Sequence, residues 1–155
     1  MASDKEKIEY KLIDWIALES NGRLIAFKPE NGADLVVQKR GGYNEKKLSF
    51  KIETASLLKG ENTSEKNYYF VFANFDEVKQ NIVEKIAVIS SVDLLEVIKK
   101  IEKTSVNGIA LKDFLNNKEY STYLMDKKSF VSFLIANLIA DSKSVAKTGF
   151  KSKKY

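Results

Sequence analysis

The amino-acid sequence predicts an α/β domain with a central mixed sheet of five strands, flanked by helices and followed by extra C-terminal helices. Three observations support this prediction. Apolar residues recur at helical spacing near the N-terminus, five short segments rich in β-branched and aromatic residues follow, and apolar helical patterns return near the C-terminus. Helices and strands in this order are typical of a layered architecture.

The first predicted helix runs from Ile8 to Ser20, because its apolar residues lie three or four positions apart and Asn21-Gly22 is a typical C-terminal stop. The predicted strands are residues 23–27, 35–37, 48–52, 68–72 and 85–89. Gly41 and Gly42 lie between the second and third strands and predict a β-hairpin with a loop of several residues. The polar segment 59–67 is predicted to be an exposed loop.

Three further helices are predicted at residues 92–103, 111–115 and 127–140, the first of them capped by Ser90-Ser91. The last helix is apolar beyond a single stripe, which indicates either core packing or a homodimer interface. The aromatic residues of strand 68–72, with Phe75, could form a base-stacking platform, but their density in one strand favours a core packed on both faces.

The chain has 155 residues, with no Cys and no His. This length predicts one domain, residues 1–142, followed by a tail, residues 143–155. The missing residue types exclude thiol nucleophiles, imidazole acid and base chemistry, and zinc sites built on Cys or His. The lack of cysteine and of long apolar runs predicts a cytoplasmic protein without a membrane partner.

The formal charge is +5, from 26 basic and 21 acidic residues. After Asp141 the sequence has no acid and carries five lysines, at positions 143, 147, 151, 153 and 154. The tail therefore accounts for the whole excess of positive charge. Such a tail attracts phosphate backbones, and it also serves as a solvated terminus that keeps a protein in solution.

Asp34 opens one predicted strand and Lys51 lies inside the next, so the hairpin brings a carboxylate and an ammonium to one place at the sheet edge. Ser49 and Glu53 share a strand face with Lys51. Phosphodiester hydrolysis needs a divalent cation with oxygen ligands, and a lysine beside the metal can orient the attacking water. The pattern therefore predicts a metal-dependent nuclease site. The bland alternative is an Asp that caps a turn and a Lys that blocks a sheet edge.

These residues resemble the PD-(D/E)XK nuclease superfamily, which has the restriction-endonuclease-like fold and includes Holliday-junction resolvases. The positions that match its pattern are Glu9 on the first helix, Asp34 in GADLVV and Lys51 in LSFKIETAS. The later segments YYFVF and KIAVI, followed by SSVDLLEVI, also look like such domains, and the resemblance covers about residues 5 to 100. Ser49 is a departure, since the family has Glu or Gln two residues before the lysine.

The resemblance implies a DNA endonuclease of the restriction or resolvase type that uses Mg²⁺ or Mn²⁺. Catalytic candidates are Glu9, Asp34, Lys51, Glu53 and Ser49, with Glu19 as an alternative helical acid because it lies on the apolar face. The metal ligands would be Asp34, Glu9 and Glu53. The DNA backbone would be contacted by cations around the hairpin and in the tail, namely Lys39, Arg40, Lys46, Lys47, Lys147, Lys151, Lys153 and Lys154. The alternative is an inactive module of this fold that binds nucleic acid or a protein partner.

Overall fold

The computed structural model describes residues 3–30, 32–42, 45–54, 57–58, 66–83, 85–104 and 109–139. The larger strands are β1 (Leu24–Phe27), β2 (Leu35–Lys39), β3 (Lys47–Glu53), β5 (Tyr68–Phe72) and β8 (Ile86–Ser90). Five two-residue strands complete the set, β4 (Leu57–Leu58), β6 (Phe75–Asp76), β7 (Asn81–Ile82), β9 (Ile109–Ala110) and β10 (Leu124–Met125). The helices are α1 (Asp4–Glu19), α2 (Ser91–Thr104), α3 (Leu111–Leu115), the 3₁₀ helix η1 (Lys118–Tyr123) and α4 (Lys127–Leu138).

The central sheet has six strands in the order β1-β2-β3-β5-β8-β10. Strands β3 and β5 run parallel, whereas the other neighbours run antiparallel. The predicted α/β class with a mixed sheet is therefore confirmed, with one more strand than the five expected. The sequence analysis missed β10, because two residues are too few to show an alternating pattern.

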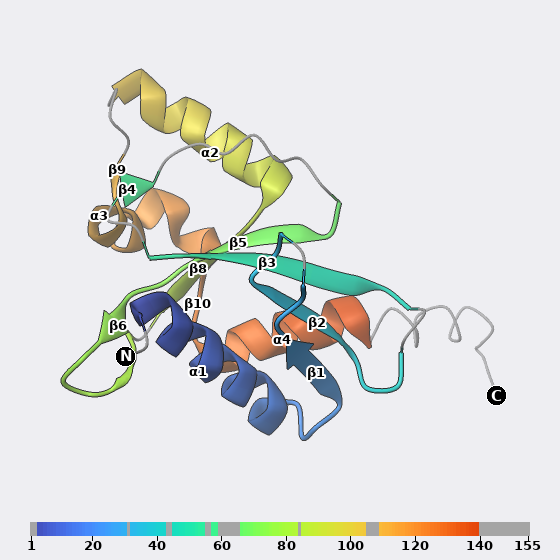
Figure 1. Ribbon diagram of the computed structural model, residues 1–155. Coiled ribbons are helices and arrows are strands. Elements are labelled where there is room, and N and C mark those ends of the chain that lie inside the picture. Colours follow the sequence, from blue (N-terminus) through green and yellow to red (C-terminus); the bar gives the residue numbers. More distant parts are fainter. Residues whose placement is uncertain are drawn as a thin grey trace.

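Helices cover both faces of this sheet, with α1 and α4 on one side and α2 and α3 on the other (Figure 1). The α1 side holds a large apolar cluster in which Ile8, Leu12 and Phe130 pack with Phe50 and Ile52 of β3. The opposite side holds a second cluster, made by β5, β8, α2, α3 and η1. Alternate residues of a strand point to opposite faces, so β3 and β5 contribute to both layers.

The aromatic strand 68–72 packs on both of its faces, as its density of rings predicted. Phe70 and Phe72 lie in the cluster below α2, while Val71 and the half-buried Tyr69 belong to the α1 side. Tyr69 stacks on Phe50 with ring centroids 5.6 Å apart. These rings are therefore core residues and not an exposed platform.

Helix α1 begins at a capping box, in which Ser3 Oγ accepts from the Glu6 amide and the Glu6 carboxylate accepts from the Ser3 amide. It ends where Asn21 and Gly22 take positive φ angles of 54° and 74°. The predicted stop at this pair is confirmed, and the helix starts four residues earlier than expected. The sequence pattern did not indicate the Ser3 cap, because the charged residues Asp4, Lys5 and Lys7 interrupt the apolar periodicity in the first turn.

Helix α4 ends at Leu138, close to the predicted end. Its apolar residues Phe130, Val131, Leu134 and Leu138 are buried, and Phe130 and Leu134 lie in the α1-side cluster. The chain itself thus uses much of this apolar surface, so the surface is no argument for a second subunit. The homodimer stays a prediction. Within the described residues, no helix combines the length and the apolar character needed to cross a bilayer.

Candidate functional site at the end of the sheet

Asp34 lies immediately before β2, at the end of the sheet over which the N-terminal half of α1 passes. Its amide donates to the Phe50 carbonyl over 2.9 Å, and its Oδ2 accepts from the Ile52 amide over 2.8 Å. The carboxylate thus takes the place of a backbone carbonyl and ends the β2–β3 ladder. Its second oxygen, Oδ1, is 3.1 Å from Lys5 Nζ on α1.

Lys51 lies across the hairpin from Asp34. Leu35 pairs with Phe50 in an antiparallel register, so the next position places Asp34 opposite Lys51. The predicted approach of these two residues along the backbone is therefore present. Within the described chain no hydrogen bond or ion pair joins their side chains, because the Asp34 oxygens are directed to Lys5 and to the Ile52 amide.

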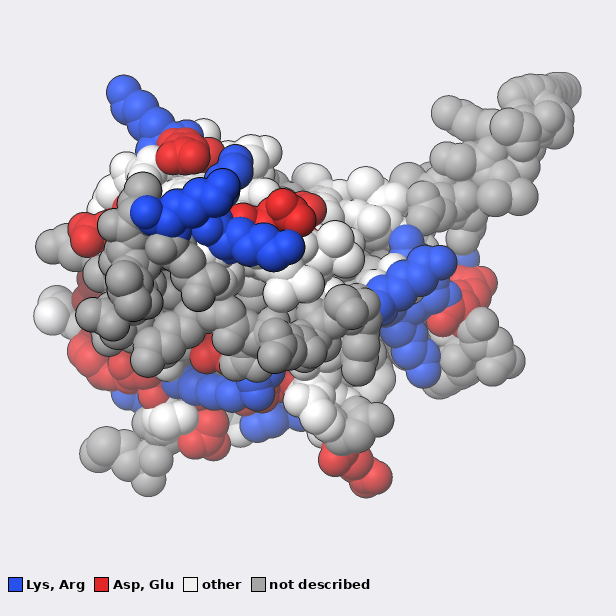
Figure 2. Space-filling model, turned by 90° about the horizontal axis from the view of Figure 1, so that it is seen from above, with Lys and Arg blue, Asp and Glu red and all other residues white. Residues whose placement is uncertain are grey.

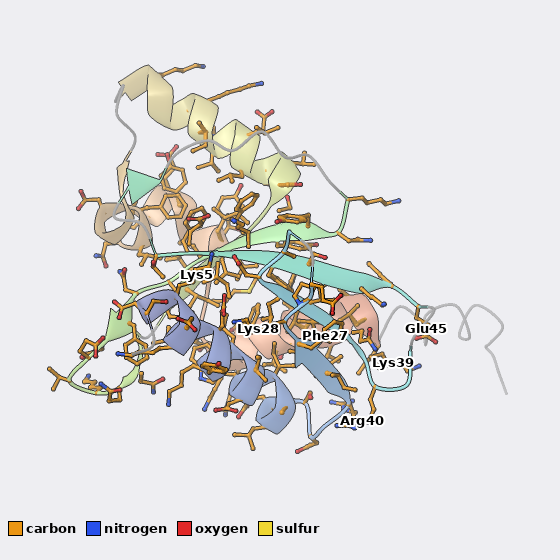
Figure 3. All side chains as sticks on the ribbon, viewed as in Figure 1. Lys5, Phe27, Lys28, Lys39, Arg40 and Glu45 are labelled. Atoms are coloured by element: carbon orange, nitrogen blue, oxygen red, sulfur yellow. The ribbon has the colours of Figure 1, made fainter. Side chains whose placement is uncertain are left out.

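Glu9 is buried between α1 and the sheet, with 3% of its surface exposed. Its Oε1 lies 2.9 Å from the Nζ atom of Lys28, which is the residue that follows β1. The Glu9 carboxylate raises the pKa of Lys28 by accepting its hydrogen bond and by its charge. Lys28 also lies over the ring of Tyr10, 5.8 Å from its centroid. Figure 3 shows Lys5 and Lys28 in the space between α1 and the sheet.

We call Lys5, Glu9, Lys28, Asp34 and Lys51 the sheet-end cluster. Lys5 and Glu9 are one helical turn apart on α1, and the other three residues come from the ends of β1 and β2 and from β3. Three ammonium groups therefore accompany two carboxylates. The five residues of the cluster together carry a formal charge of +1, and Glu6, an acid of the first turn of α1, lies near enough to Lys28 to interact with its charge.

The sheet separates Lys51 from Glu9. Phe50 and Ile52, the sequence neighbours of Lys51, point into the cluster below α1, so Lys51 leaves β3 toward the face of α2. Ser49 and Glu53 share that face and pair in register with Tyr68 and Phe72 of β5. The predicted strand neighbours are confirmed, but the helical acid approaches from the other side of the sheet.

The alternative helical acid, Glu19, lies at the far end of α1. Ten residues of α-helix separate it from Glu9, about 15 Å along the axis. Its Oε2 is 4.0 Å from Lys127 Nζ at the start of α4. The structure therefore does not bring Glu19 to Asp34, and of the two candidate acids only Glu9 lies at this end.

The structure also places the cations predicted to contact a nucleic-acid backbone. Lys39 ends β2 and Arg40 follows it, while Lys46 and the exposed Lys47 lie at the start of β3. These residues are at the opposite end of the hairpin from Asp34. The tail residues Lys147, Lys151, Lys153 and Lys154 lie outside the described part of the chain, as do most of the predicted loop 59–67 and Tyr43 and Asn44 of the hairpin loop.

The predicted magnesium ligands do not form a cation site as they are arranged. Both Asp34 oxygens have a partner, and Glu9 is buried beside Lys28. Among the described residues no group of three acids is placed to hold one metal ion. Mg²⁺ prefers several oxygen ligands in near-octahedral geometry. The donor set therefore does not fit this ion without displacement of at least one lysine.

Sequence reasoning missed Lys5 and Lys28, which complete the cluster. Lys5 carried a weak signal, because it precedes Glu9 by one helical turn and so shares its side of α1. Lys28 carried no such signal in the sequence, since its position depends on where β1 ends against β2.

Comparisons of the chain with protein families, with curated proteins and with solved structures found no match.

Replacing Lys28 by alanine is expected to lower the free energy of unfolding, because it leaves the Glu9 carboxylate buried without its ammonium partner. The pair's contribution is present below the ordinary lysine pKa of 10.5 and is lost as the pH rises through the raised pKa of Lys28. Urea unfolding at pH 7 measures the loss. Lys7→Ala is the matched control, since Lys7 pairs with the more exposed Glu77 at 3.0 Å. Equal losses for both variants would contradict a special role for the buried pair.

Proposed function

We propose that this chain is a nucleic-acid-binding protein that contacts phosphate groups through the sheet-end cluster and the basic tail, without hydrolysing them. The observation that supports this most is the state of Asp34. One carboxylate oxygen holds Lys5 and the other is bonded to the Ile52 amide, so Asp34 positions an ammonium group. A carboxylate used in this way is a structural anchor.

Lysine ammonium groups are compact point charges on flexible stems and bind phosphate oxygens without base specificity. In the cluster, Lys5 and Lys28 are each tethered to an acid and retain part of their surface in solvent, with side chains 37% and 46% exposed. Tethering limits the conformations that each lysine must lose on binding. Lys5 and Lys28 are thus preorganised cations, and Lys51 adds a third ammonium group from the other face of the sheet.

One face of the molecule agrees with localised contact. Figure 2 shows that, on the face seen from above, Lys and Arg side chains gather in separate groups with acidic side chains beside them. No continuous basic layer covers the part of that face formed by described residues. The tail, with five lysines and no acid, would add the long-range attraction.

A metal-dependent DNA endonuclease is the second candidate, and one observation favours it. The register places Asp34 opposite Lys51 at the end of the β2–β3 hairpin, below the N-terminal half of α1, as the resemblance to the PD-(D/E)XK superfamily implies. In this proposal the restriction-endonuclease-like fold is retained, and Asp34, Glu9 and Glu53 would hold Mg²⁺ or Mn²⁺ after rearrangement. Ser49 and the two existing ion pairs count against it.

Fluorescence anisotropy with a labelled 20-base-pair duplex and a four-way junction, combined with a cleavage assay in Mg²⁺ or Mn²⁺, tests the two candidates. Wild-type protein is expected to bind both DNAs and to leave them intact. Lys51→Gln should weaken binding several-fold and lower the salt slope by about 1, because one phosphate contact is lost. Lys79→Gln is the control, since Lys79 is exposed on the β6–β7 turn and takes part in neither ion pair of the cluster.

The possible results separate the candidates. Metal-dependent cleavage by wild type that is absent in Asp34→Asn and in Lys51→Ala would replace the binding proposal with the nuclease. Failure of the wild type to bind either DNA at low salt would remove both.

A further inference from the structure

A second group of cations surrounds an open cavity at the other end of α1. The cavity has a volume of about 590 Å³ and is lined by Asn21, Gly22, Arg23, Lys39, Arg40 and Ile139. Three of these six residues are cationic and none is acidic. Figure 3 shows Lys39 and Arg40 at this end, with Glu45 near Lys39, far from Lys5.

Backbone carbonyls at the C-terminal end of α1 hold both arginines. Arg23 Nε donates to the Ser20 carbonyl over 3.1 Å, and Arg40 Nε donates to the Gly22 carbonyl over 2.5 Å. Helix C-termini attract cations, which explains the position of the two Nε atoms. This attraction does not account for the terminal nitrogens of the two guanidinium groups, because no described residue accepts a hydrogen bond from them.

The sheet forces these like charges together. The Arg40 amide donates to the Arg23 carbonyl over 2.9 Å, and Leu24 pairs with Lys39, so Arg23 and Arg40 are opposed at the next position, just beyond the end of the β1–β2 pair. Like charges in opposed positions repel and destabilise a strand pair. The nearby acid, Glu45, lies 3.8 Å from Lys39 in an exposed pair, which compensates little. An anion between the guanidinium groups would relieve this repulsion.

The arrangement of the hydrogen-bond donors indicates which anion would bind here. A guanidinium group fixed through Nε presents its terminal N–H groups in a planar fork, which matches two oxygens of a phosphate. Two such forks and one flexible ammonium surround a space large enough for a phosphate with its attached groups. We infer that the cavity lined by Arg23, Lys39 and Arg40 is a phosphate-binding site and that its ligand is a backbone phosphate of a nucleic acid.

The identity of this ligand rests on the proposed function. The position of the cavity also predicts how long a stretch of nucleic acid the chain contacts. Lys5 and Ser20 are fifteen residues apart on one helix, which corresponds to about 22 Å. Successive phosphates of one DNA strand are about 3.4 Å apart along the axis, so the two cation groups span about six nucleotides. A duplex shorter than this span cannot occupy both sites.

Two measurements test the inference. In the first, inorganic phosphate is titrated into the wild-type chain and backbone amides are followed by NMR. Saturable shifts are expected for Gly22, Arg23 and Arg40, with smaller shifts for acetate at equal ionic strength. In the second, the affinity for a 16-base-pair duplex and for a 5-base-pair duplex held together by an interstrand cross-link is measured for Arg23→Gln/Arg40→Gln. The double variant should bind the 16-mer at least tenfold more weakly and the 5-mer nearly as well as wild type does.

The control is Lys79→Gln/Lys118→Gln, which removes the same charge from exposed positions and should change affinity for the 16-mer less than threefold. Arg23→Lys/Arg40→Lys keeps the charge and should give an intermediate loss of affinity, because lysine lacks the planar fork of N–H donors.

The phosphate-binding site is overturned if phosphate shifts no amide of the cavity, a result that holds even if the arginine variants fail to fold. Wild-type affinity of a folded arginine variant for the 16-mer overturns the nucleic-acid ligand and leaves the sheet-end proposal standing. Phosphate binding here without duplex binding by the wild type supports a site for free phosphate and refutes the nucleic-acid function.

Discussion

Replacing Phe50 by alanine is expected to lower the free energy of unfolding by about 3–5 kcal/mol, the usual range for a large aromatic residue in a packed core. Phe50 has no exposed surface and lies in β3, near the middle of the six-stranded sheet. Its ring stacks on Tyr69 and meets the edge of Phe130, with centroids 5.6 Å and 5.9 Å away. One truncation would therefore remove contacts between the sheet and α4.

Urea unfolding followed by fluorescence of Trp15 measures this loss. Phe27→Ala is the control, because Phe27 is 38% exposed at the end of the edge strand β1 and its truncation should cost about 1 kcal/mol or less. Equal costs for the two phenylalanines would show that β3 is not the centre of the core. The position of Lys51 in the sheet-end cluster would then be wrong as well, since β3 carries Lys51.

Ending the chain at residue 142 is expected to weaken binding to duplex DNA by about 100-fold at 0.1 M salt, through the loss of counterion release at up to five phosphates. The removed segment carries five lysines and no acid. The slope of log affinity against log salt should become less steep by up to about 4. Anisotropy titrations over a salt series measure both quantities.

A variant in which the five tail lysines are replaced by glutamine separates charge from length. It should behave as the truncated chain does, whereas replacement by arginine should preserve the slope. An unchanged slope after truncation would leave the tail as a solvated terminus, the alternative that the sequence also allowed.

The sequence predicted the long elements of the fold because their signals are local. The strand 68–72 has the predicted limits, and Asn21-Gly22 ends α1 as expected. The short strands β4, β6, β7, β9 and β10 were missed, since two residues carry no period and their pairing is decided by partners distant in sequence. β10, for example, is a strand only because it pairs with β8.

The candidate site was predictable in part for the same reason. Hairpin register brought Asp34 and Lys51 into opposition, and alternation placed Ser49 and Glu53 beside Lys51. The side of the sheet from which Glu9 approaches was not predictable, because it depends on how α1 packs on the finished sheet. Nor could the sequence show that Lys5 and Lys28 would pair with the two acids, since the contacts join residues 29 and 19 positions apart.

Lysine acylation followed by mass spectrometry, with and without a 16-base-pair duplex, measures whether cations of the sheet-end cluster contact phosphate. Such contact predicts that Lys5, Lys28 and Lys51 lose reactivity in the complex, while Lys79 and Lys118 react as in the isolated chain. Protection confined to the tail, or spread evenly over all lysines, would contradict it.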